Sequence, residues 1–473
     1  MKFLRVFLLM WCSAASLQAL SEPLPLPTDS SPLSSGGLLT LWVRSEKTLA
    51  DPVMVKLVLK EKTGGKTRYQ QLHYTRANQT DWSRLSAWIP AAQDGAERTL
   101  ILESPDGAGI LRERLRMVKA PPQKASFSPG FLRVRGADLL NEQGTFLFRG
   151  VNVTAYSDEE KESVPDVLGM VTEEDYRQIA AFGFNSVRLA CWHRALAGAD
   201  GIEWLRLQVS LARQYGLYLI LDMHAPPSGY QSNKYRGPFW HPEKGEPFRA
   251  QLLAFWQQVA REFRDEPVIA AYDLLNEPKP KKDSQWHEYV RLLIRAIRDE
   301  GDAHAIVVET SMLDEAQWVK FEDDSIIYDT HWYEPWSFVA QSEKKPWGDY
   351  GKHHRLWGEE VILNRDYLAK RLALYQKWCA EHRVPMQVGE YGVNHYTQSE
   401  SIGGLHWLSD MVSLFEEFRI SRFYWSWFPF DMGICEGWWR RDPGVVHSEV
   451  AAIAARPLPD SPKKTNAKRD EIE

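Results

Sequence analysis

From about residue 150 onward, the sequence alternates between short apolar segments and longer amphipathic segments. Eight segments have the length and the apolar, often β-branched composition of buried strands: 150–153, 186–189, 217–223, 269–275, 305–309, 326–330, 385–388 and 423–427. Apolar residues at three- and four-residue spacing predict helices between most of them: 173–182, 203–215, 248–263, 286–298, 363–382 and 405–418. Eight strands that alternate with helices over roughly 320 residues predict a (β/α)₈ TIM barrel.

A doubly wound open sheet is the rival architecture for this alternation. A nucleotide-binding sheet of that kind carries a glycine-rich GxGxxG or GxxxxGK[ST] motif after its first strand. Neither motif follows 150–153. The sequence therefore favours the closed barrel.

The N-terminal part of the chain has a different pattern. Short alternating runs between residues 38 and 118, broken by turn residues, predict a small antiparallel β-sandwich. We expect a linker at 121–124 and a hairpin over 131–134 and 145–148. The predicted organisation is a signal segment at 1–20, a β-sandwich at 21–125, the barrel at 126–456 and a disordered tail at 457–473.

The first 20 residues predict export. Lys2 and Arg5 give a positive start, the apolar run 6–15 follows, and a cleavage site is expected near Ala19. The apolar run is shorter than the ~20 residues of a membrane span, and no later segment predicts one. Cys12 suggests a lipoprotein, but Trp11 stands where a small residue is expected. The prediction is therefore a secreted protein, extracellular or periplasmic.

The net charge and the cysteine content limit the kinds of ligand that the protein is expected to bind. The net charge of −6 gives no basic surface for nucleic acid. Removal of the signal leaves three cysteines, Cys191, Cys379 and Cys435, without the spacing of a zinc site. One disulfide remains possible, with its partners open.

Polar residues collect where the predicted strands end. Active sites of TIM barrels lie at the carboxyl ends of their strands. The residues at those ends are Arg188, His224, Asn276, Glu277, His331, Tyr333, Glu390 and Trp425. This concentration at one rim is the strongest functional signal in the sequence.

Two carboxyl groups at this rim, Glu277 and Glu390, match the needs of glycoside hydrolysis. That reaction uses one carboxyl to protonate the leaving oxygen and a second on the other face of the sugar. Asn276 is suited to bind the sugar 2-hydroxyl, and Arg188 and Tyr333 to keep one carboxylate ionised. The other carboxyl needs a raised pKa to act as an acid.

The motifs resemble those of glycoside hydrolase family 5, the cellulase-like retaining β-glycosidases. The matching segments are Asn185 to Arg188, Leu221 to His224, Leu275 to Pro278, Thr330 to Tyr333, Val388 to Gly392 and Trp425 to Trp427. The resemblance covers roughly residues 130 to 450. It implies that Glu277 is the acid/base, Glu390 the nucleophile and Trp425 a sugar platform, with Arg188, His224, Asn276, His331 and Tyr333 in support.

The remaining ionisable residues have less specific interpretations. Glu309, at the end of a strand, is expected to be a structural group or a support for the site residues rather than a third functional carboxylate. Asp222 and Asp273 lie within strands and are expected to be buried hydrogen-bonding partners. His224 and His331 lack a patterned set of further ligands, so a sugar or carboxylate contact is favoured over a metal. No metal or cofactor is expected.

Aromatic residues are abundant, with 20 Trp in the chain. Six of the chain's aromatic residues fall in loops after predicted strands, where each one either packs the loop or stacks on a sugar, and together they predict an aromatic-lined cleft: Trp192, Tyr230, Trp240, Trp336, Trp438 and Trp439. The sandwich, with Trp42, Trp82 and Trp88 expected to be exposed, either binds carbohydrate or braces the barrel, and a brace is favoured.

Several functions stay open at this stage. The complete set of site residues favours a hydrolase of a β-linked glycan, β-glucan first, with an endoglucanase or an exoglucanase/β-glucosidase action. A transglycosylase or a mannan- or exopolysaccharide-directed hydrolase fits the same site. A non-catalytic glycan-binding protein is the alternative class, because a fold alone does not guarantee activity.

Overall fold

The computed structural model describes most of the chain downstream of the signal region. The described residues are 20–23, 37–45, 53–77, 83–89, 92, 96–104, 110–118, 127, 129–157, 164–229, 238–310, 318–428, 431–435 and 446–457. The predicted signal, apart from Leu20, and the predicted tail, apart from Pro457, lie outside these residues. Among the described helices, none combines the length and the hydropathy that crossing a bilayer requires.

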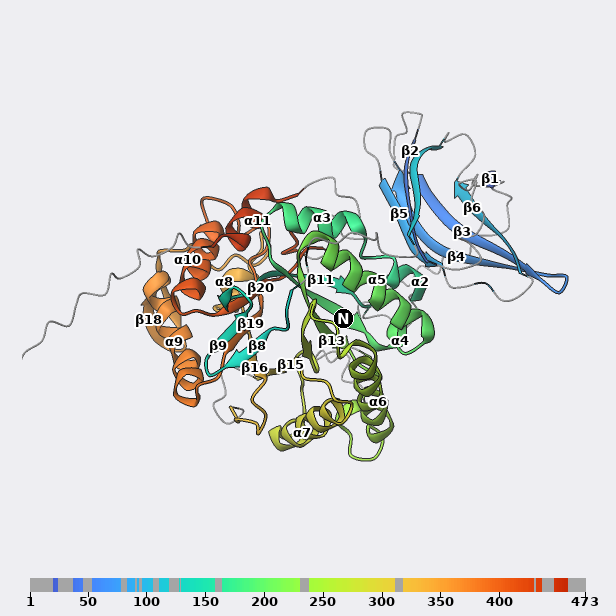
Figure 1. Ribbon diagram of the computed structural model, residues 1–473. Coiled ribbons are helices and arrows are strands. Elements are labelled where there is room, and N and C mark those ends of the chain that lie inside the picture. The colour runs from blue at the N-terminus through green and yellow to red at the C-terminus, as the bar shows by residue number, and fades with distance from the viewer. Residues whose placement is uncertain are drawn as a thin grey trace, which may run out of the picture.

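Eight parallel strands close into a barrel at the centre of the molecule (Figure 1). In order around the barrel they are β11 (Arg149–Ala155), β12 (Ser186–Trp192), β13 (Tyr218–Ala225), β14 (Ile269–Asp273), β15 (Ala305–Glu309), β16 (Ile326–Trp332), β19 (Met386–Tyr391) and β20 (Ser421–Tyr424). All eight overlap the predicted strands, with the smallest overlap at β20, which was predicted at 423–427. β11 pairs with β20, which completes the predicted TIM barrel.

Helices follow the strands and cover the outside of the barrel. They are α2 (Val164–Leu168), α3 (Glu173–Ala181), α4 (His193–Leu196), α5 (Ala199–Tyr215), α6 (Glu246–Phe263), α7 (Asp283–Asp299), α8 (Trp336–Val339), α9 (Arg365–His382), α10 (Gly404–Glu417) and α11 (Ser448–Ala455), with the 3₁₀ turn Pro238–Trp240. The six predicted helices are present, within a few residues of their predicted bounds. A hairpin of β17 (His353–Leu356) and β18 (Glu359–Ile362) is inserted between β16 and β19.

The predicted hairpin ahead of the barrel is a three-stranded meander. Its strands are β8 (Arg133–Arg135), β9 (Asp138–Asn141) and β10 (Gly144–Phe146). The prediction was wrong about which residues pair: Leu132 and Phe148 are buried outside the strands and pack in one cluster with barrel residues such as Val307.

The N-terminal region is an all-β unit of two sheets. One sheet has the order β1 (Leu20–Pro23), β6 (Glu97–Ser104), β3 (Val53–Thr63) and β4 (Lys66–Ala77). The other has the order β5 (Ser83–Ile89), β2 (Gly37–Ser45) and β7 (Ile110–Val118). Twelve buried apolar residues, among them Leu41, Leu57 and Leu100, form the core of this unit.

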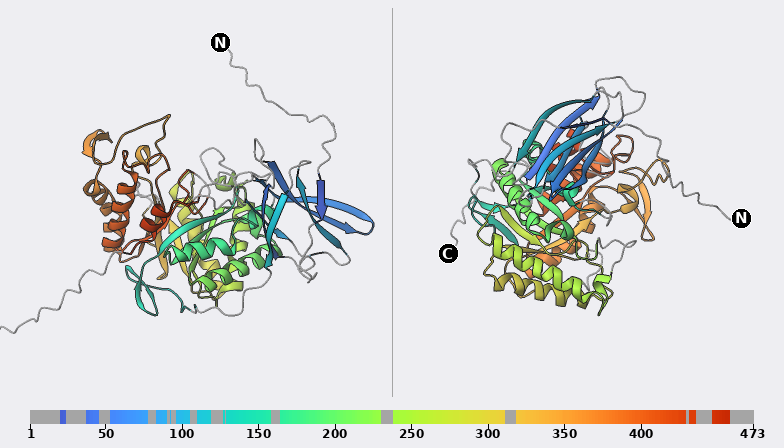
Figure 2. Two further views of the ribbon diagram at one scale, coloured as in Figure 1. Left: turned by 90° about the horizontal axis from the view of Figure 1, so that it is seen from above. Right: turned by 90° about the vertical axis from the view of Figure 1, so that its right-hand side faces the viewer.

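The sandwich contacts the barrel through β5 and the segment of α2 and α3. Figures 1 and 2 show it beside the helices that follow β11 and β12, away from α10. Arg84 donates a 2.7 Å hydrogen bond to Thr172 and forms a buried ion pair with Asp175. Gly169 lies so close to β5 that an added Cβ would be 2.4 Å from the Cα of Ala87. The contact is a closely packed one, as a brace requires.

Candidate active site

The site is built around Arg188, which is fully buried and is the third residue of β12, within the strand rather than at the predicted strand end. Its guanidinium donates to Asp273 (2.9 Å), Asn152 (2.9 Å), Asn276 (2.9 Å) and Glu309 (2.8 Å) and contacts Glu390 at 3.3 Å. Asp222 Oδ2 is 3.2 Å away. A guanidinium presents several donors in one rigid plane, so this one residue links β12 to five of the other seven barrel strands.

Glu390, near the end of β19, is held at both carboxylate oxygens. Oε1 contacts Arg188, and Oε2 accepts a 2.9 Å hydrogen bond from the hydroxyl of Tyr333. Asp329 and Asn152 fix the preceding residue: Asp329 accepts from the N–H of Gly389 at 2.6 Å, and Asn152 donates to its carbonyl at 2.8 Å. A Cβ on Gly389 would lie 2.1 Å from Asp329 Oδ2, so only glycine fits here.

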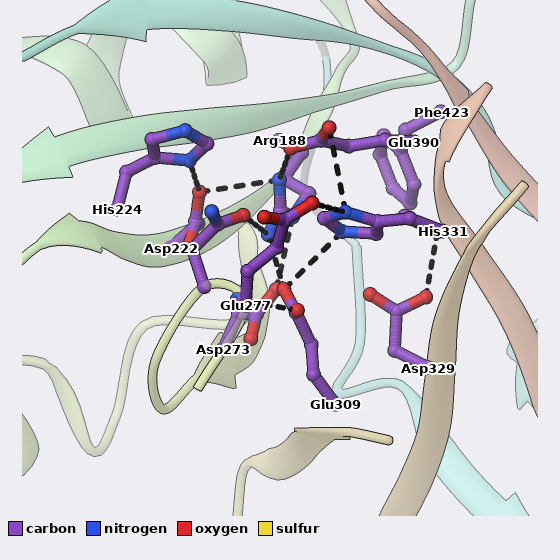
Figure 3. Close-up of polar contacts among 12 residues, drawn as sticks. Arg188, Asp222, His224, Asp273, Glu277, Glu309, Asp329, His331, Glu390 and Phe423 are labelled. Atoms are coloured by element: carbon purple, nitrogen blue, oxygen red, sulfur yellow. Dashed lines mark hydrogen bonds and ion pairs between the residues drawn. The ribbon is translucent and has the colours of Figure 1, made fainter. Parts of the chain in front are cut away.

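Glu277 follows β14 and faces Glu390. His331 Nδ1 lies 3.1 Å from Glu277 Oε1 and 3.4 Å from Glu390 Oε2. One oxygen of each glutamate and a nitrogen of His331 lie within 4.8 Å of one another. Figure 3 shows the two glutamates and Glu309 converging on His331 and Arg188. The sequence prediction of two carboxylates meeting across the barrel mouth is thus met by the geometry.

Lys279 is a neighbour of Glu277 that sequence reasoning missed. Its Nζ lies 2.9 Å from Glu277 Oε2. A lysine in a Pro-Lys-Pro-Lys-Lys segment has the appearance of an ordinary solvated residue, and nothing in the sequence indicated the contact. Asn152, on β11, was also missed, and only its position on a barrel strand pointed to it.

The pKa order of the two glutamates is opposite to the sequence expectation. Burial raises the pKa of Glu277, but the hydrogen bond with His331 and the charge of Lys279 outweigh it and hold the pKa well below the usual range. Burial raises the pKa of Glu390, and the opposing charges of His331 and Arg188 do not cancel it. The expectation failed because Arg188 is shared among several carboxylates, while two cations contact Glu277.

His331 carries the proton of this group. Burial disfavours its charged form, but Glu309 and Glu390 raise its pKa well above the usual value. Glu277 and His331 are therefore an ion pair that holds one transferable proton between Nδ1 and Oε1. Bound substrate can change the relative basicity of Glu277 and His331, and the more basic of the two then holds this proton.

His224 and Trp425 form a stacked pair of rings in the site. The His224 Nδ1 lies 2.7 Å from Asp222 Oδ2, and burial lowers the pKa of His224 to about 3, so the ring is neutral. Trp425 stacks on this ring with centroids 5.2 Å apart and planes at 13°. Tyr156, which sequence reasoning did not single out, packs on the same ring at 4.2 Å.

The sequence analysis also made predictions about Asp222 and Asp273, about Glu309, and about a metal. Asp222 and Asp273 are fully buried partners of Arg188, as expected. Glu309, expected to be a supporting or structural group, contacts Arg188 and His331. Three overlapping groups could offer ligands to a metal: Glu277/His331/Glu390, Glu309/Asp329/His331 and Asp222/Asp273/Glu309. The absence of a metal requirement stays a prediction.

The loop aromatics divide into core and surface residues. Trp192 and Trp240 are buried packing residues, which decides the open choice between loop packing and sugar stacking for these two. Trp336 is 62% exposed and packs edge-on against Tyr333. Tyr230, Trp438 and Trp439 lie outside the described residues. In the sandwich, Trp88 is buried rather than exposed, and Trp82 lies outside the described residues.

The three cysteines expected in the mature chain are all free and buried: Cys191, Cys379 and Cys435. The disulfide that the sequence left open is therefore not formed among them.

Most of the chain is similar to members of a cellulase family. The model of the cellulase family, glycosyl hydrolase family 5, matches residues 142–431, which is more than half of the chain. Endoglucanase C of Acetivibrio thermocellus is 25% identical over 324 residues, covering 60% of this chain and 91% of the relative. Cellodextrinase A of Ruminococcus flavefaciens is 26% identical over 332 residues, covering 66% and 94%. A probable glucan 1,3-beta-glucosidase A of Emericella nidulans is 27% identical over 179 residues, covering 35% and 44%.

Solved structures share the barrel. Thermotoga maritima Cel5A in complex with mannotriose has a TM-score of 0.51 at 20% identity and covers 65% of this chain and 97% of that one. The Clostridial cellulose synthase subunit Z from Clostridioides difficile has the same score and identity, with 65% and 99% covered. At this identity the likeness establishes the fold.

Proposed function

The chain belongs to the cellulase family, glycosyl hydrolase family 5, and on that basis we propose that it is a secreted, retaining hydrolase of a β-glucan. Membership in the family makes it a glycoside hydrolase. The choice of a glucan is supported by its relatives, which are named endoglucanase, cellodextrinase and glucan 1,3-beta-glucosidase.

One observation carries the retaining mechanism. Oxygens of Glu277 and Glu390 approach within 4.8 Å. Retaining enzymes place their carboxyl groups about 5–5.5 Å apart, whereas inverting enzymes leave about 6.5–9.5 Å for a water molecule. The separation here supports direct attack by one carboxylate on the sugar.

In the first step Glu390 attacks the anomeric carbon. Arg188 and Tyr333 orient its two oxygens. The bond between the anomeric carbon and the glycosidic oxygen breaks, and that oxygen takes a proton from Glu277. The product is a glycosyl ester of Glu390 together with the released leaving group.

In the second step Glu277 accepts a proton from water. The water oxygen attacks the anomeric carbon, and the ester bond to Glu390 breaks with its electron pair returning to the carboxylate. Two inversions restore the original anomeric configuration.

The Glu277/His331 pair supplies the proton for the first step. The proton that is transferred is the one shared by His331 Nδ1 and Glu277 Oε1, which are 3.1 Å apart. Once Glu390 has become a neutral ester, a negative charge 3.4 Å from Nδ1 is lost. Loss of that charge lowers the proton affinity of the pair. After the pair has given its proton to the leaving group, Glu277 therefore stays ionised and can accept a proton from water.

Asn276 and Trp425 are suited to hold the sugar at the cleavage position. Asn276 Oδ1 accepts from Arg188, and among the described residues its buried Nδ2 has no partner. An amide donor fixed in this way fits the sugar 2-hydroxyl, a contact that strengthens at the transition state. Trp425, braced by His224, offers an aromatic face for the ring.

The test is hydrolysis of a panel of substrates by the purified mature protein. The panel comprises β-1,4-glucan, β-1,3-glucan, mannan and aryl β-glycosides, with Glu277→Gln and Glu390→Gln as inactive controls. We expect a β-glucan to be cleaved, with a β-anomeric reducing end as the first product by proton NMR. An α-anomer as first product would contradict retention, and cleavage of mannan alone would contradict the glucan.

Secretion is the second part of the proposal. It is supported by Lys2, Arg5 and the apolar run 6–15. Intact-mass analysis of the protein from the culture medium or periplasm should give an N-terminus close to residue 20. Protein that stays in the cytoplasm with Met1 retained would contradict it.

A further inference from the structure

Glu309, at the end of β15, makes three contacts inside the site. Its Oε2 accepts from the backbone N–H of Glu277 at 2.6 Å. Its Oε1 accepts from Arg188 at 2.8 Å and lies 3.3 Å from His331 Nε2. Only 4% of Glu309 is exposed. A buried carboxylate is costly unless it is paired, and here every partner belongs to the group that surrounds the two glutamates.

The contact with Glu277 holds an unfavourable backbone conformation. Glu277 has a φ of 40°, in the left-handed region that a non-glycine residue adopts at a cost. Its N–H cannot join the ladder of β14, which ends at Asp273. The Glu309 carboxylate accepts this N–H and so fixes the direction in which the Glu277 side chain leaves the chain.

The contact with His331 bears on its charge. Nδ1 faces Glu277 and Glu390, and Nε2 faces Glu309. A neutral imidazole has one donor and one acceptor nitrogen, whereas the imidazolium has two donors. Carboxylate oxygens lie near both nitrogens, and the contact of Nε2 with Glu309 is an ion pair at 3.3 Å without hydrogen-bond geometry. Negative charges on both sides of the ring favour the imidazolium.

Other charges also surround His331. Asp222 from β13 and Asp329 from β16 itself act on its charge. Arg188 from β12 and Lys279 from the segment after β14 contact its carboxylate neighbours Glu309 and Glu277. Burial raises the pKa of Asp329 well above its usual range, so this residue adds little negative charge. Burial raises the pKa of Glu309, but its contacts with His331 and Arg188 outweigh burial and lower the pKa below the ordinary value. Glu309 is therefore ionised.

We propose that Glu309 is a positioning residue of the reaction, which fixes the backbone of the acid/base glutamate and holds His331 as an imidazolium. In this role it keeps a proton on the Glu277/His331 pair at the pH where the leaving group must receive it. The proposal rests on the proposed function and extends it by one residue.

The first experiment measures kcat/KM against pH for Glu309→Gln, with an aryl β-glucoside that has a poor leaving group. The alkaline limb reports loss of the proton on the Glu277/His331 pair. Removal of a negative charge 3.3 Å from Nε2 should move this limb about 1 to 3 units to lower pH. A lower rate with an unmoved limb would overturn the proposal, since it would indicate a structural role alone.

Two variants serve as controls. Glu309→Asp keeps the charge but shortens the side chain, so its rate should fall. Its alkaline limb should lie closer to that of the wild type than the limb of Glu309→Gln does. Glu416→Gln removes another buried carboxylate, which is paired with Arg149 and Arg422 outside the site, and should leave the limb in place. A shift in Glu416→Gln equal to that in Glu309→Gln would overturn the proposal.

The second experiment needs neither substrate nor a folded variant of Glu309. Nitrogen NMR of the wild-type protein with labelled histidine, assigned by comparison with His331→Gln, reports the protonation of both ring nitrogens. We expect His331 to remain doubly protonated at neutral pH and above. Titration of His331 near the ordinary value of about 6.5 would overturn the proposal, whereas failure of the wild type to cleave any glycan would count against the proposed function alone.

Discussion

Replacement of Lys279 by methionine should change the pH dependence of catalysis in a predictable direction. Methionine keeps an unbranched apolar side chain but removes the ammonium group, which lies 2.9 Å from Glu277 Oε2. This cation stabilises the ionised carboxylate. Without it, the proton shared by Glu277 and His331 is held more tightly, and the alkaline limb of kcat/KM should move to higher pH.

The size of the shift follows from the geometry. An opposite charge within 4–6 Å changes a pKa by about 1 to 3 units. The side chains of Lys279 and Glu277 are 29% and 33% exposed, so water screens the pair. We therefore expect the lower end of that range, about one unit, or about 1.4 kcal/mol.

The assay is kcat/KM against pH for an aryl β-glucoside with a poor leaving group. Lys281→Met, which removes an exposed lysine from the same segment, is the matched control and should leave the profile unchanged. In wild-type enzyme, about 1 M salt should move the limb part of the way toward that of Lys279→Met, because the Debye length falls to about 3 Å. A limb that stays in place in Lys279→Met, or moves to lower pH, would refute the reasoning.

Three further predictions address other parts of the molecule. Trp425→Ala should lower kcat/KM on a β-glucan by roughly tenfold or more, since each 1.4 kcal/mol of lost transition-state binding is a factor of ten; kinetics on oligosaccharides check it, and an unchanged value would remove Trp425 from the site. Arg84→Met leaves Asp175 buried without its ion-pair partner and should cost about 3 kcal/mol of stability, seen as a lower thermal midpoint with activity of the folded enzyme retained. Treatment with a chelator should leave hydrolysis unchanged, because two carboxylates suffice for the reaction; loss of activity restored by added metal would show the opposite.

The barrel was predictable because each of its strands is an apolar segment bounded by turn residues. The site was predictable because a parallel barrel brings all carboxyl ends of its strands to one rim. Arg188, Glu277 and Glu390 are far apart in sequence, yet this single rule places them together. The resemblance to a family then distinguished the two glutamates.

The sandwich strand β5 shows where sequence patterns fail. It contains Ser83, Arg84 and Ser86, which suggest a surface segment, and Trp88 was expected to be exposed. All seven residues of β5 are buried, because one face packs in the sandwich and the other contacts the segment around Gly169 and Asp175. Polar residues on this strand are satisfied by partners more than 80 positions away.

The pKa order of the glutamates was unpredictable for a similar reason. It depends on which cation reaches which oxygen, at distances near 3 Å. Lys279 is two residues from Glu277, but its side-chain direction follows from a local backbone conformation that no sequence pattern specified. Arg188 was expected to serve one carboxylate and serves several.

The most direct test of the account uses azide with two alanine variants and a dinitrophenyl β-glucoside. Glu277→Ala should form the glycosyl-enzyme, because this leaving group needs no proton, and azide should then release a β-glucosyl azide. Glu390→Ala has no nucleophile, so azide should attack directly and give the α-anomer. The same anomer from both variants, or no rescue of either, would contradict the assignment of Glu277 as acid/base and Glu390 as nucleophile.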